Sequence, residues 1–182
     1  MTLIVRHAQV ADAPSLGELI ARSARALNTV EYRVAQVEGA LRGAFGVDSQ
    51  LIEDQTYFLM EESGAIVGCG GWSYRSTLFG GDARAGRDAS RLQAGRDAAK
   101  IRAFFVEPSH VRRGIGSLLL ERCEREAAAQ GYTAVELMAT LSGVKLYRAR
   151  GYCGTAVTRY DVGGGESIDF VAMRKQLDGR PT

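Results

Sequence analysis

The chain has 182 residues, a length that fits a single domain able to bury a core of its own. Its composition, 46% hydrophobic and 24% charged, excludes a largely disordered chain, and a net charge of +2 argues against nucleic acid as a partner. Three cysteines without C-x-x-C spacing and only two histidines favour neither a disulfide framework nor a metal site. Because no apolar run suits a membrane span or a signal peptide, we expect a cytoplasmic protein.

Hydrophobic spacing and turn residues divide the N-terminal part of the chain into three strands and two helices. Asp12 suits the cap of the first helix, and Pro14 suits its first turn. Gly68, Gly70 and Gly71 interrupt the third strand, where we expect a bulge or a close approach of another segment. In chain order the predicted elements are a strand at 3–6, a helix at 12–27, a helix at 30–44, and a hairpin of strands at 56–61 and 65–74.

Residues 76–100 lack the hydrophobic spacing of the preceding segments. They are rich in Gly, Ala, Arg and Asp and show weak periodicity. A loop of this length in a compact domain is either functional or mobile, so we expect a flexible insertion in one domain that spans residues 1–182. The elements predicted after it are a strand at 101–106, a helix at 114–130, a strand at 134–139, a short helix at 142–150, and closing strands at 152–160 and 168–175. This order predicts an α/β fold built on one mixed sheet.

The stretch from 104 to 120 has the order strand, short turn, glycines, helix. A helix that begins near Gly114 leaves its first N–H groups without intrahelical partners, and its dipole places partial positive charge there. Gly114 and Gly116 have no side chain, so a diphosphate can approach the backbone, and Arg112 and Arg113 add positive charge. The pattern predicts an anion site, although a lone G-x-G also fits a glycine turn before an ordinary helix.

Two common phosphate-binding motifs do not fit this stretch. The dinucleotide fingerprint G-x-G-x-x-G has Leu119 at its third glycine position. The P-loop requires G-K-S/T, whereas Gly116 is followed by Ser117 and Leu118. The glycines alone therefore leave the identity of the diphosphate open.

The segment Val111-Arg112-Arg113-Gly114-Ile115-Gly116 resembles motif A of the GCN5-related N-acetyltransferase (GNAT) superfamily, which reads Q/R-x-x-G-x-G/A after a strand and a proline-containing turn. It departs from that motif at Val111, where the family has Gln or Arg. Residues 141–152 are similar to the family's motif B, a short helix with a tyrosine before a Gly-aromatic step. Residues 4–13 also look like the family's first strand entering its first helix, so the resemblance covers nearly the whole chain.

This resemblance implies a mixed, mostly antiparallel sheet whose central strands splay apart, flanked by helices. It also implies an acetyltransferase that binds acetyl-CoA between those strands, without a metal ion, and moves the acetyl group directly to a primary amine. The cofactor-binding residues that it implies are Phe104, Phe105 and Val106 along the pantetheine arm, Arg112, Arg113, Gly114, Ile115, Gly116 and Ser117 at the pyrophosphate, and Ser142 and Tyr147 on the short helix.

Direct transfer needs no enzyme nucleophile, which agrees with the lack of a G-x-S-x-G motif in this chain. The resemblance implies that Tyr147 is the general acid, since a tyrosine (pKa about 10) can protonate a thiolate (pKa about 8.5). A backbone N–H near Val106 can stabilise the developing oxyanion. Glu107 and Glu136 are the candidates, by position, to receive the amine's proton directly or through water. Without the family resemblance, Tyr147 is interpreted as a packed aromatic side chain. Glu107 is then interpreted as a turn residue, and Glu136 as a solvent-facing residue.

Two functions from different classes remain open at this point. The first is N-acetylation of an amine, of a small molecule rather than a protein, and the second is a non-catalytic acyl-CoA sensor on the same fold. The arginines between 84 and 96 interleave with aspartates, which favours a solvated loop over an acidic partner. We expect residues 28–48 and 74–100 to shape the acceptor pocket, but they contain no pattern that identifies the amine. The family also suggests a homodimer formed by paired C-terminal edge strands.

Overall fold

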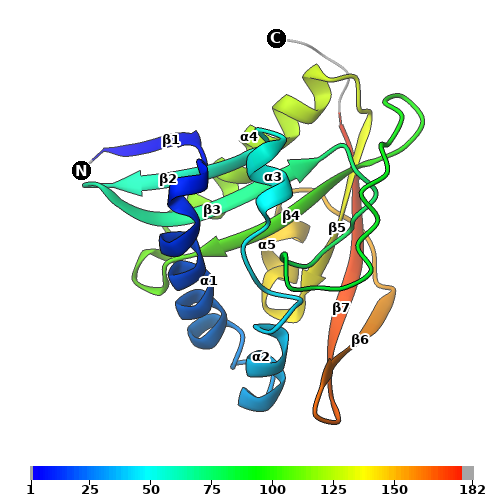
Figure 1. The fold of residues 1–182 in the computed structure, drawn as a ribbon. Coiled ribbons are helices and arrows are strands. Elements are labelled where there is room, and N and C mark those ends of the chain that lie inside the picture. Colours follow the sequence, from blue (N-terminus) through cyan, green and yellow to red (C-terminus); the bar gives the residue numbers. More distant parts are fainter. Residues whose placement is uncertain (1, 178–182) are drawn as a thin grey trace.

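The computed structural model describes residues 2–177 and shows a seven-stranded mixed sheet flanked by helices, which confirms the predicted fold class. The strand order is β1-β2-β3-β4-β5-β7-β6, and all neighbouring strands are antiparallel except β4 and β5. The elements (Figure 1) are β1 Leu3–His7, α1 Ala13–Leu27, α2 Val34–Ala40, α3 Ser49–Glu53, β2 Tyr57–Glu62, β3 Ala65–Ser73, β4 Ala99–Val106, α4 Ile115–Ala129, β5 Ala134–Thr140, α5 Val144–Ala149, β6 Val157–Gly163 and β7 Glu166–Gln176.

The main differences from the predicted elements fall in the segment between α1 and β2. The expected helix at 30–44 is limited to α2, because Tyr32 is held at the sheet by a 2.7 Å hydrogen bond from its hydroxyl to the carbonyl of Asp169. The chain then turns after Ala40, and Phe45 is buried in the core. Helix α3, which buries Leu51 and Ile52, was not predicted because five residues are too few to show helical spacing.

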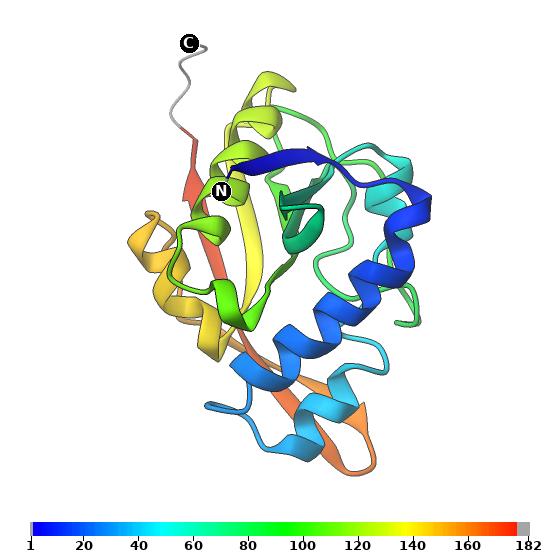
Figure 2. The same cartoon turned by 90° about the vertical axis from the view of Figure 1, so that its left-hand side faces the viewer.

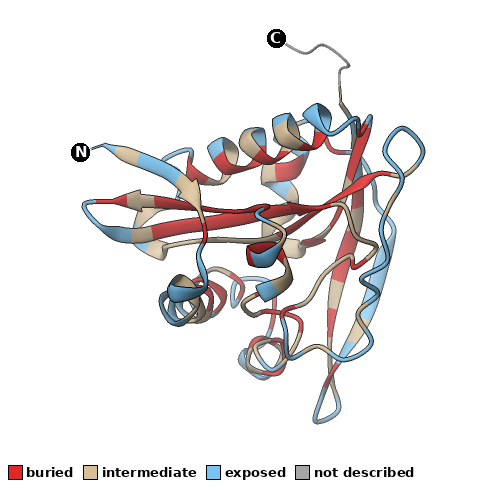
Figure 3. Ribbon diagram, turned by 45° about the horizontal axis from the view of Figure 1, so that its top comes forward, coloured by how far each residue is buried: buried red, intermediate tan, exposed pale blue. Residues whose placement is uncertain are grey.

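The helices cover the two faces of the sheet. Helices α4 and α5 lie on one face, called here the α4 face, and α1 and α2 lie on the other, the α1 face (Figures 2 and 3). Alternation along a strand supplies both cores, so that Phe58 and Met60 of β2 pack on the α4 face while Tyr57 and Leu59 pack on the α1 face. The same alternation assigns each side chain of β4 to one of the two faces.

Glycines in β3 allow β4 and α4 to pack closely, as the sequence predicts. An added Cβ at Gly68 would lie 2.5 Å from Ile115, and one at Gly70 would lie 2.6 Å from the ring of Phe104. The pairing of β3 with β4 also shifts register between Cys69 and Gly71. The extra residue lies in β4, where Ala103 has a φ of 57°, and this bulge confirms the expected irregularity.

Strands β4 and β5 separate soon after they begin, which opens the sheet at its centre (Figure 1). Their only paired residues in the described chain are Ala99 with Val135 and Lys100 with Glu136. An ion pair between Lys100 and Glu136 joins the two strands at this closed end. The gap beyond it positions the site described below.

The segment between β3 and β4 crosses the α1 face of the molecule. Arg75 donates to both carboxylate oxygens of Asp54, at 2.6 and 2.7 Å, and the backbone of Arg75 bridges to that of Arg91. Its middle part packs on the α2–α3 loop, where the N–H of Gly81 donates to the carbonyl of Gly43. Within residues 2–177, every helix is too short or too polar to cross a bilayer.

Candidate active site

A cavity of about 660 Å³ lies where β4 and β5 have separated. Its wall includes Phe104, Val106 and Tyr147 from the α4-face core, and Phe45 and Phe105 from the α1-face core. The cavity therefore takes its lining from both faces of the sheet. Residues that belong to different layers of the fold line one cavity.

On the α4 face the wall is the turn that enters α4. Gly114 caps the helix with a φ of 82°, and a Cβ added there would meet no atom within 4 Å. Gly116 lies so close to α5 that an added Cβ would be 3.1 Å from Leu146. The first N–H groups of α4 have no intrahelical acceptor, so this turn presents donors and a helix dipole to the cavity. The predicted anion site is thus on the cavity wall, together with Arg112 and Ser117.

Arg113 does not share this position, in contrast to its predicted role at a pyrophosphate. Its guanidinium donates to both oxygens of Glu62, at 2.6 and 3.0 Å, and Arg113 lies outside the cavity lining. His110 also contacts Glu62, at 2.9 Å. Arg113 and His110 together hold the pKa of Glu62 well below its usual range, at about 2. Arg113 anchors the turn to β2 instead of facing a ligand, whereas His110 anchors the turn and also lines the cavity.

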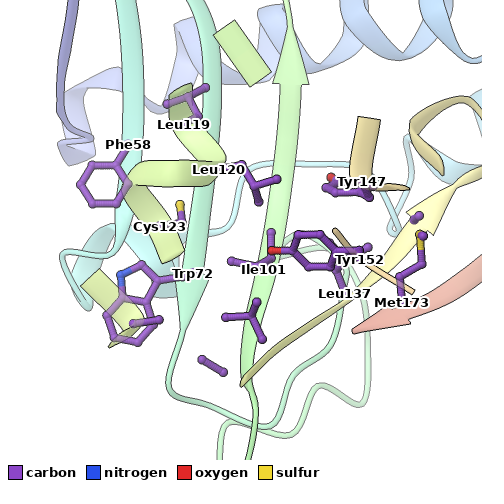
Figure 4. Packing of buried hydrophobic residues seen from close by; sticks show 14 of the residues in the cluster. Phe58, Trp72, Ile101, Leu119, Leu120, Cys123, Leu137, Tyr147, Tyr152 and Met173 are labelled. Atoms are coloured by element: carbon purple, nitrogen blue, oxygen red, sulfur yellow. The ribbon is translucent and has the colours of Figure 1, made fainter. Parts of the chain in front are cut away.

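Two predicted residues before and within α5 line the cavity. The hydroxyl of Ser142 is buried and has no hydrogen-bond partner among the described residues. Tyr147 is 9% exposed, and burial raises its pKa above the ordinary value. Its ring packs edge-to-face on Tyr152 at 5.6 Å (Figure 4), and the Tyr152 hydroxyl donates to Glu124 at 2.9 Å. Tyr147 is therefore both a packed aromatic and a cavity residue.

The backbone N–H of Val106, predicted as an oxyanion donor, already has an acceptor. It donates to the hydroxyl oxygen of Ser23 at 3.2 Å. Ser23 lies on α1, is 3% exposed and also lines the cavity. Sequence reasoning missed Ser23 because its position within the apolar stripe of α1 indicates only burial.

The two predicted proton acceptors lie outside the cavity lining. Glu107 accepts from Arg22 at 3.0 and 3.1 Å. Glu136 is bound by Lys100 at the closed end of the sheet, with Arg174 at 3.6 Å. Each carboxylate is held by a cation in a structural contact, so the geometry does not support either one as the base that contacts the amine.

On the α1 face the wall is aromatic. Phe45 lies edge-on to Phe105 at 5.9 Å and to Phe170 at 6.4 Å, and Phe79 lies 4.9 Å from Phe170. All four rings line the cavity. The expectation that 28–48 and 74–100 shape a pocket agrees with the position of Phe45 and Phe79, which come from these two segments.

A buried ion pair interrupts this apolar wall. Asp48 and Arg102 are 1% and 4% exposed, line the cavity and bind each other. Arg87 donates to the other oxygen of Asp48 at 3.0 Å from outside the lining. Burial raises the pKa of Asp48 and lowers that of Arg102, while the attraction between the two charges opposes both shifts. The sequence signal for Arg102 is a charged residue within the otherwise apolar run 101–106.

The family model described as "Acetyltransferase (GNAT) family" matches residues 25–152, a range that contains the turn into α4, β5 and α5. No curated protein matches the chain. Among solved structures, a GCN5-related N-acetyltransferase from Rhodopseudomonas palustris has a TM-score of 0.71 and 19% identity, with 97% of each chain covered.

Two further solved structures contain the cofactor or its product. The PaiA N-acetyltransferase from Thermoplasma acidophilum, in complex with coenzyme A, has a TM-score of 0.64 and 16% identity, over 97% of this chain and 99% of that one. A putative acetyltransferase from Salmonella typhimurium, with acetyl-CoA, has a TM-score of 0.64 and 20% identity, over 100% of this chain and 98% of that one. At these identities the likeness shows a common fold.

Proposed function

Because the chain belongs to the GNAT acetyltransferase family, we propose that it is an acetyl-CoA-dependent N-acetyltransferase that modifies a primary amine of a small molecule. The observation that carries this proposal is a cavity that is lined from both faces of the sheet. Its α4-face wall is an anion-binding turn, and its α1-face wall is an aromatic compartment with a buried charge. A donor and an acceptor of different chemistry can thus meet at the gap between β4 and β5.

The α4-face wall fits acetyl-CoA. Gly114 and Gly116 expose the N-terminal N–H groups of α4, and Arg112 adds a cation, so this turn would hold the pyrophosphate. The splayed edges of β4 and β5 would take the pantetheine arm. Ser142 has a buried hydroxyl that lacks a partner in the described chain, and a cofactor amide or hydroxyl would supply one. When bound, acetyl-CoA supplies the thioester.

In the proposed transfer, the amine nitrogen attacks the thioester carbonyl, a C–N bond forms and the C–S bond breaks. The nitrogen loses a proton, and the departing sulfur gains one. Asp48 is the one carboxylate on the cavity lining of the described chain, and two guanidiniums already occupy it. We therefore assign removal of the amine's proton to water in the cavity.

Tyr147 would place its hydroxyl hydrogen against the departing sulfur. Burial raises its pKa, so the hydroxyl stays protonated at neutral pH but is a weaker acid than a free tyrosine. Complete proton transfer to a thiolate of pKa about 8.5 is uphill from such a group. Tyr147 thus acts mainly by donating a hydrogen bond as the C–S bond breaks, and the thiolate takes its proton from water in the cavity.

Ser23 would donate to the carbonyl oxygen as negative charge develops on it. Its oxygen accepts from the Val106 N–H, which leaves the hydroxyl hydrogen as the donor available to the cavity. Accepting a hydrogen bond polarises a hydroxyl and strengthens its own donation. We propose this hydroxyl, in place of the Val106 amide, as the oxyanion donor.

Two measurements on one preparation test the proposed function. Acetyl-CoA at 100 times its Kd should stabilise the protein by about 2.7 kcal/mol, seen as a rise in Tm. Thiol release is then followed over a panel of primary amines. Release with at least one amine supports the enzyme. A rise in Tm without release from any amine supports an acyl-CoA sensor instead, and the absence of both results contradicts the proposal.

A further inference from the structure

We infer that the acceptor is a primary amine that also carries a carboxylate and an apolar side chain, and that Arg102 binds the carboxylate. This inference rests on the proposed function and names its substrate class. It is carried by a buried guanidinium on the cavity wall that has a donor without an acceptor.

The side chain of Arg102 is only 2% exposed, yet the protein satisfies only part of it. One terminal nitrogen donates to Asp48 and to the carbonyl of Gly80. Its Nε has no partner among the described residues. A buried donor left unpaired destabilises the protein, and more so when the group is charged. The Nε of Arg102 therefore lacks a hydrogen-bond acceptor, and an oxygen atom of a bound ligand would provide one.

The charges around Arg102 favour an anionic oxygen over a neutral one. Asp48 is shared between Arg102 and Arg87, so one carboxylate faces two guanidiniums within the protein. The other carboxylate partner of Arg87 is Asp82, which is 44% exposed and lies outside the cavity. Among Arg102, Asp48 and Arg87, two guanidiniums therefore share one carboxylate. Guanidinium and carboxylate are geometrically matched, because both are planar and can form two parallel hydrogen bonds.

The position of Arg102 on the cavity wall suits an amino acid. Arg102 and Phe105 lie on the same strand, β4, on either side of the bulge at Ala103, and both line the cavity. A carboxylate held at Arg102 then leaves an amine a few bonds away facing the gap, where the proposed carbonyl lies. Asn28, 6% exposed, lines the cavity too and offers both a donor and an acceptor.

The four aromatic rings of the α1-face wall determine the rest of the ligand. Phe45, Phe79, Phe105 and Phe170 surround the same compartment as Arg102. An apolar or aromatic side chain of the ligand would bury its surface against these rings, which favours binding. A polyamine or an aminoglycoside, which carries several positive charges and little apolar surface, fits neither the rings nor the guanidinium.

The test compares matched pairs of amines in the thiol-release assay. Each pair is an amino acid and its decarboxylated counterpart: phenylalanine and phenethylamine, leucine and isoamylamine, tryptophan and tryptamine. Phenylalaninamide keeps the carbonyl but lacks the negative charge. In at least one pair we expect the amino acid to have a kcat/KM at least 10-fold above that of both its decarboxylated and its uncharged counterpart.

Two variants connect that preference to one side chain. Arg102→Lys keeps a cation beside Asp48 and removes the Nε donor, so kcat/KM for the amino acid should fall at least 10-fold while that for the decarboxylated amine changes less than 2-fold. Arg87→Lys is the matched control, since it alters the same ion cluster from outside the cavity and should leave the preference intact. Circular dichroism and Tm confirm that both variants fold.

The outcomes distinguish failure of the carboxylate site at Arg102 from failure of the proposed acetyltransferase function. Two outcomes overturn the carboxylate site but leave the acetyltransferase function supported. One is equal or better turnover of the decarboxylated amines, and the other is an equal loss of kcat/KM for both members of a pair in Arg102→Lys. Turnover restricted to amines outside the pairs also overturns it. No release from any amine contradicts the enzyme. Calorimetric binding of the amino acids, weakened in Arg102→Lys, would still support the site in that case, and its absence would overturn the site as well.

Discussion

The backbone N–H of Val106 donates to the hydroxyl oxygen of Ser23, 83 positions earlier in the chain, across a distance of 3.2 Å. This contact joins α1 to the end of β4 at the cavity wall. It determines which of two hydrogens, that of the amide or that of the hydroxyl, is available to a carbonyl oxygen in the gap.

Replacement of Ser23 distinguishes these two donors. If the hydroxyl stabilises the oxyanion, Ser23→Ala should lower kcat by about 10²-fold, with little change in the KM for acetyl-CoA. If the amide is the donor, the same substitution frees it, and kcat should stay the same or rise. Ser15→Ala, on an exposed position of the same helix, controls for the loss of a serine from α1. Steady-state kinetics on the two variants gives the answer.

Removal of the Tyr147 hydroxyl should impair the chemical step alone. We expect Tyr147→Phe to lower kcat by about 10²-fold and to leave the Kd for acetyl-CoA within about 2-fold, because the ring still fills its place beside Tyr152. Because its raised pKa keeps this hydroxyl protonated, Tyr147 should cause no decline in kcat below about pH 10. Tyr152→Phe, which removes a hydroxyl bonded to Glu124, should retain most of the turnover.

Gly114 should matter for the cofactor beyond its effect on folding. Alanine at its φ of 82° costs roughly 1 kcal/mol of stability. Gly64, in the β2–β3 hairpin, has a φ of 80° and equally open surroundings, so Gly64→Ala should cost about the same. Only Gly114→Ala should weaken acetyl-CoA binding, measured by calorimetry. Equal affinities for the two variants would contradict the assignment of this turn to the pyrophosphate.

The contacts of Glu62 make a contribution to stability that depends on pH. Arg113 and His110 lower the pKa of Glu62 from 4.5 to about 2. A carboxyl whose pKa is depressed by folding stabilises the protein above its unfolded pKa and loses that contribution as the pH falls through its folded pKa. The gap in unfolding free energy between the wild type and Glu62→Gln should therefore shrink from pH 4.5 to pH 2. Denaturation by urea at several pH values measures it, and a constant gap would contradict the role given to Glu62.

Local spacing accounts for most of what could be predicted from the sequence. The strand β4, the glycine turn and α4 follow one another directly between Ala99 and Ala129, so their periodicity and motif indicate the α4-face wall. The hairpin glycines likewise predicted a bulge or a close approach, because steric limits at Gly68 and Gly70 act between neighbouring strands and helices. Features of this kind are encoded near the residues that form them.

The acceptor compartment could not be predicted in the same way. Asp48 and Arg102 are 54 positions apart, and nothing near either residue indicates the other. Glu107 follows one predicted strand and Glu136 lies within another, positions that suit a proton acceptor. In the folded chain each carboxylate instead pairs with a cation outside the cavity. Such pairings depend on how distant segments pack, and a single sequence carries no record of that.

Strands β4 and β5 separate beyond the ion pair between Lys100 and Glu136, and this separation has a kinetic consequence. The cofactor and the amine would occupy opposite sides of one opening, so neither has to depart before the other enters. Turnover should then proceed through a ternary complex, with double-reciprocal plots that intersect. Each product should inhibit turnover, and no acetylated form of the protein should accumulate.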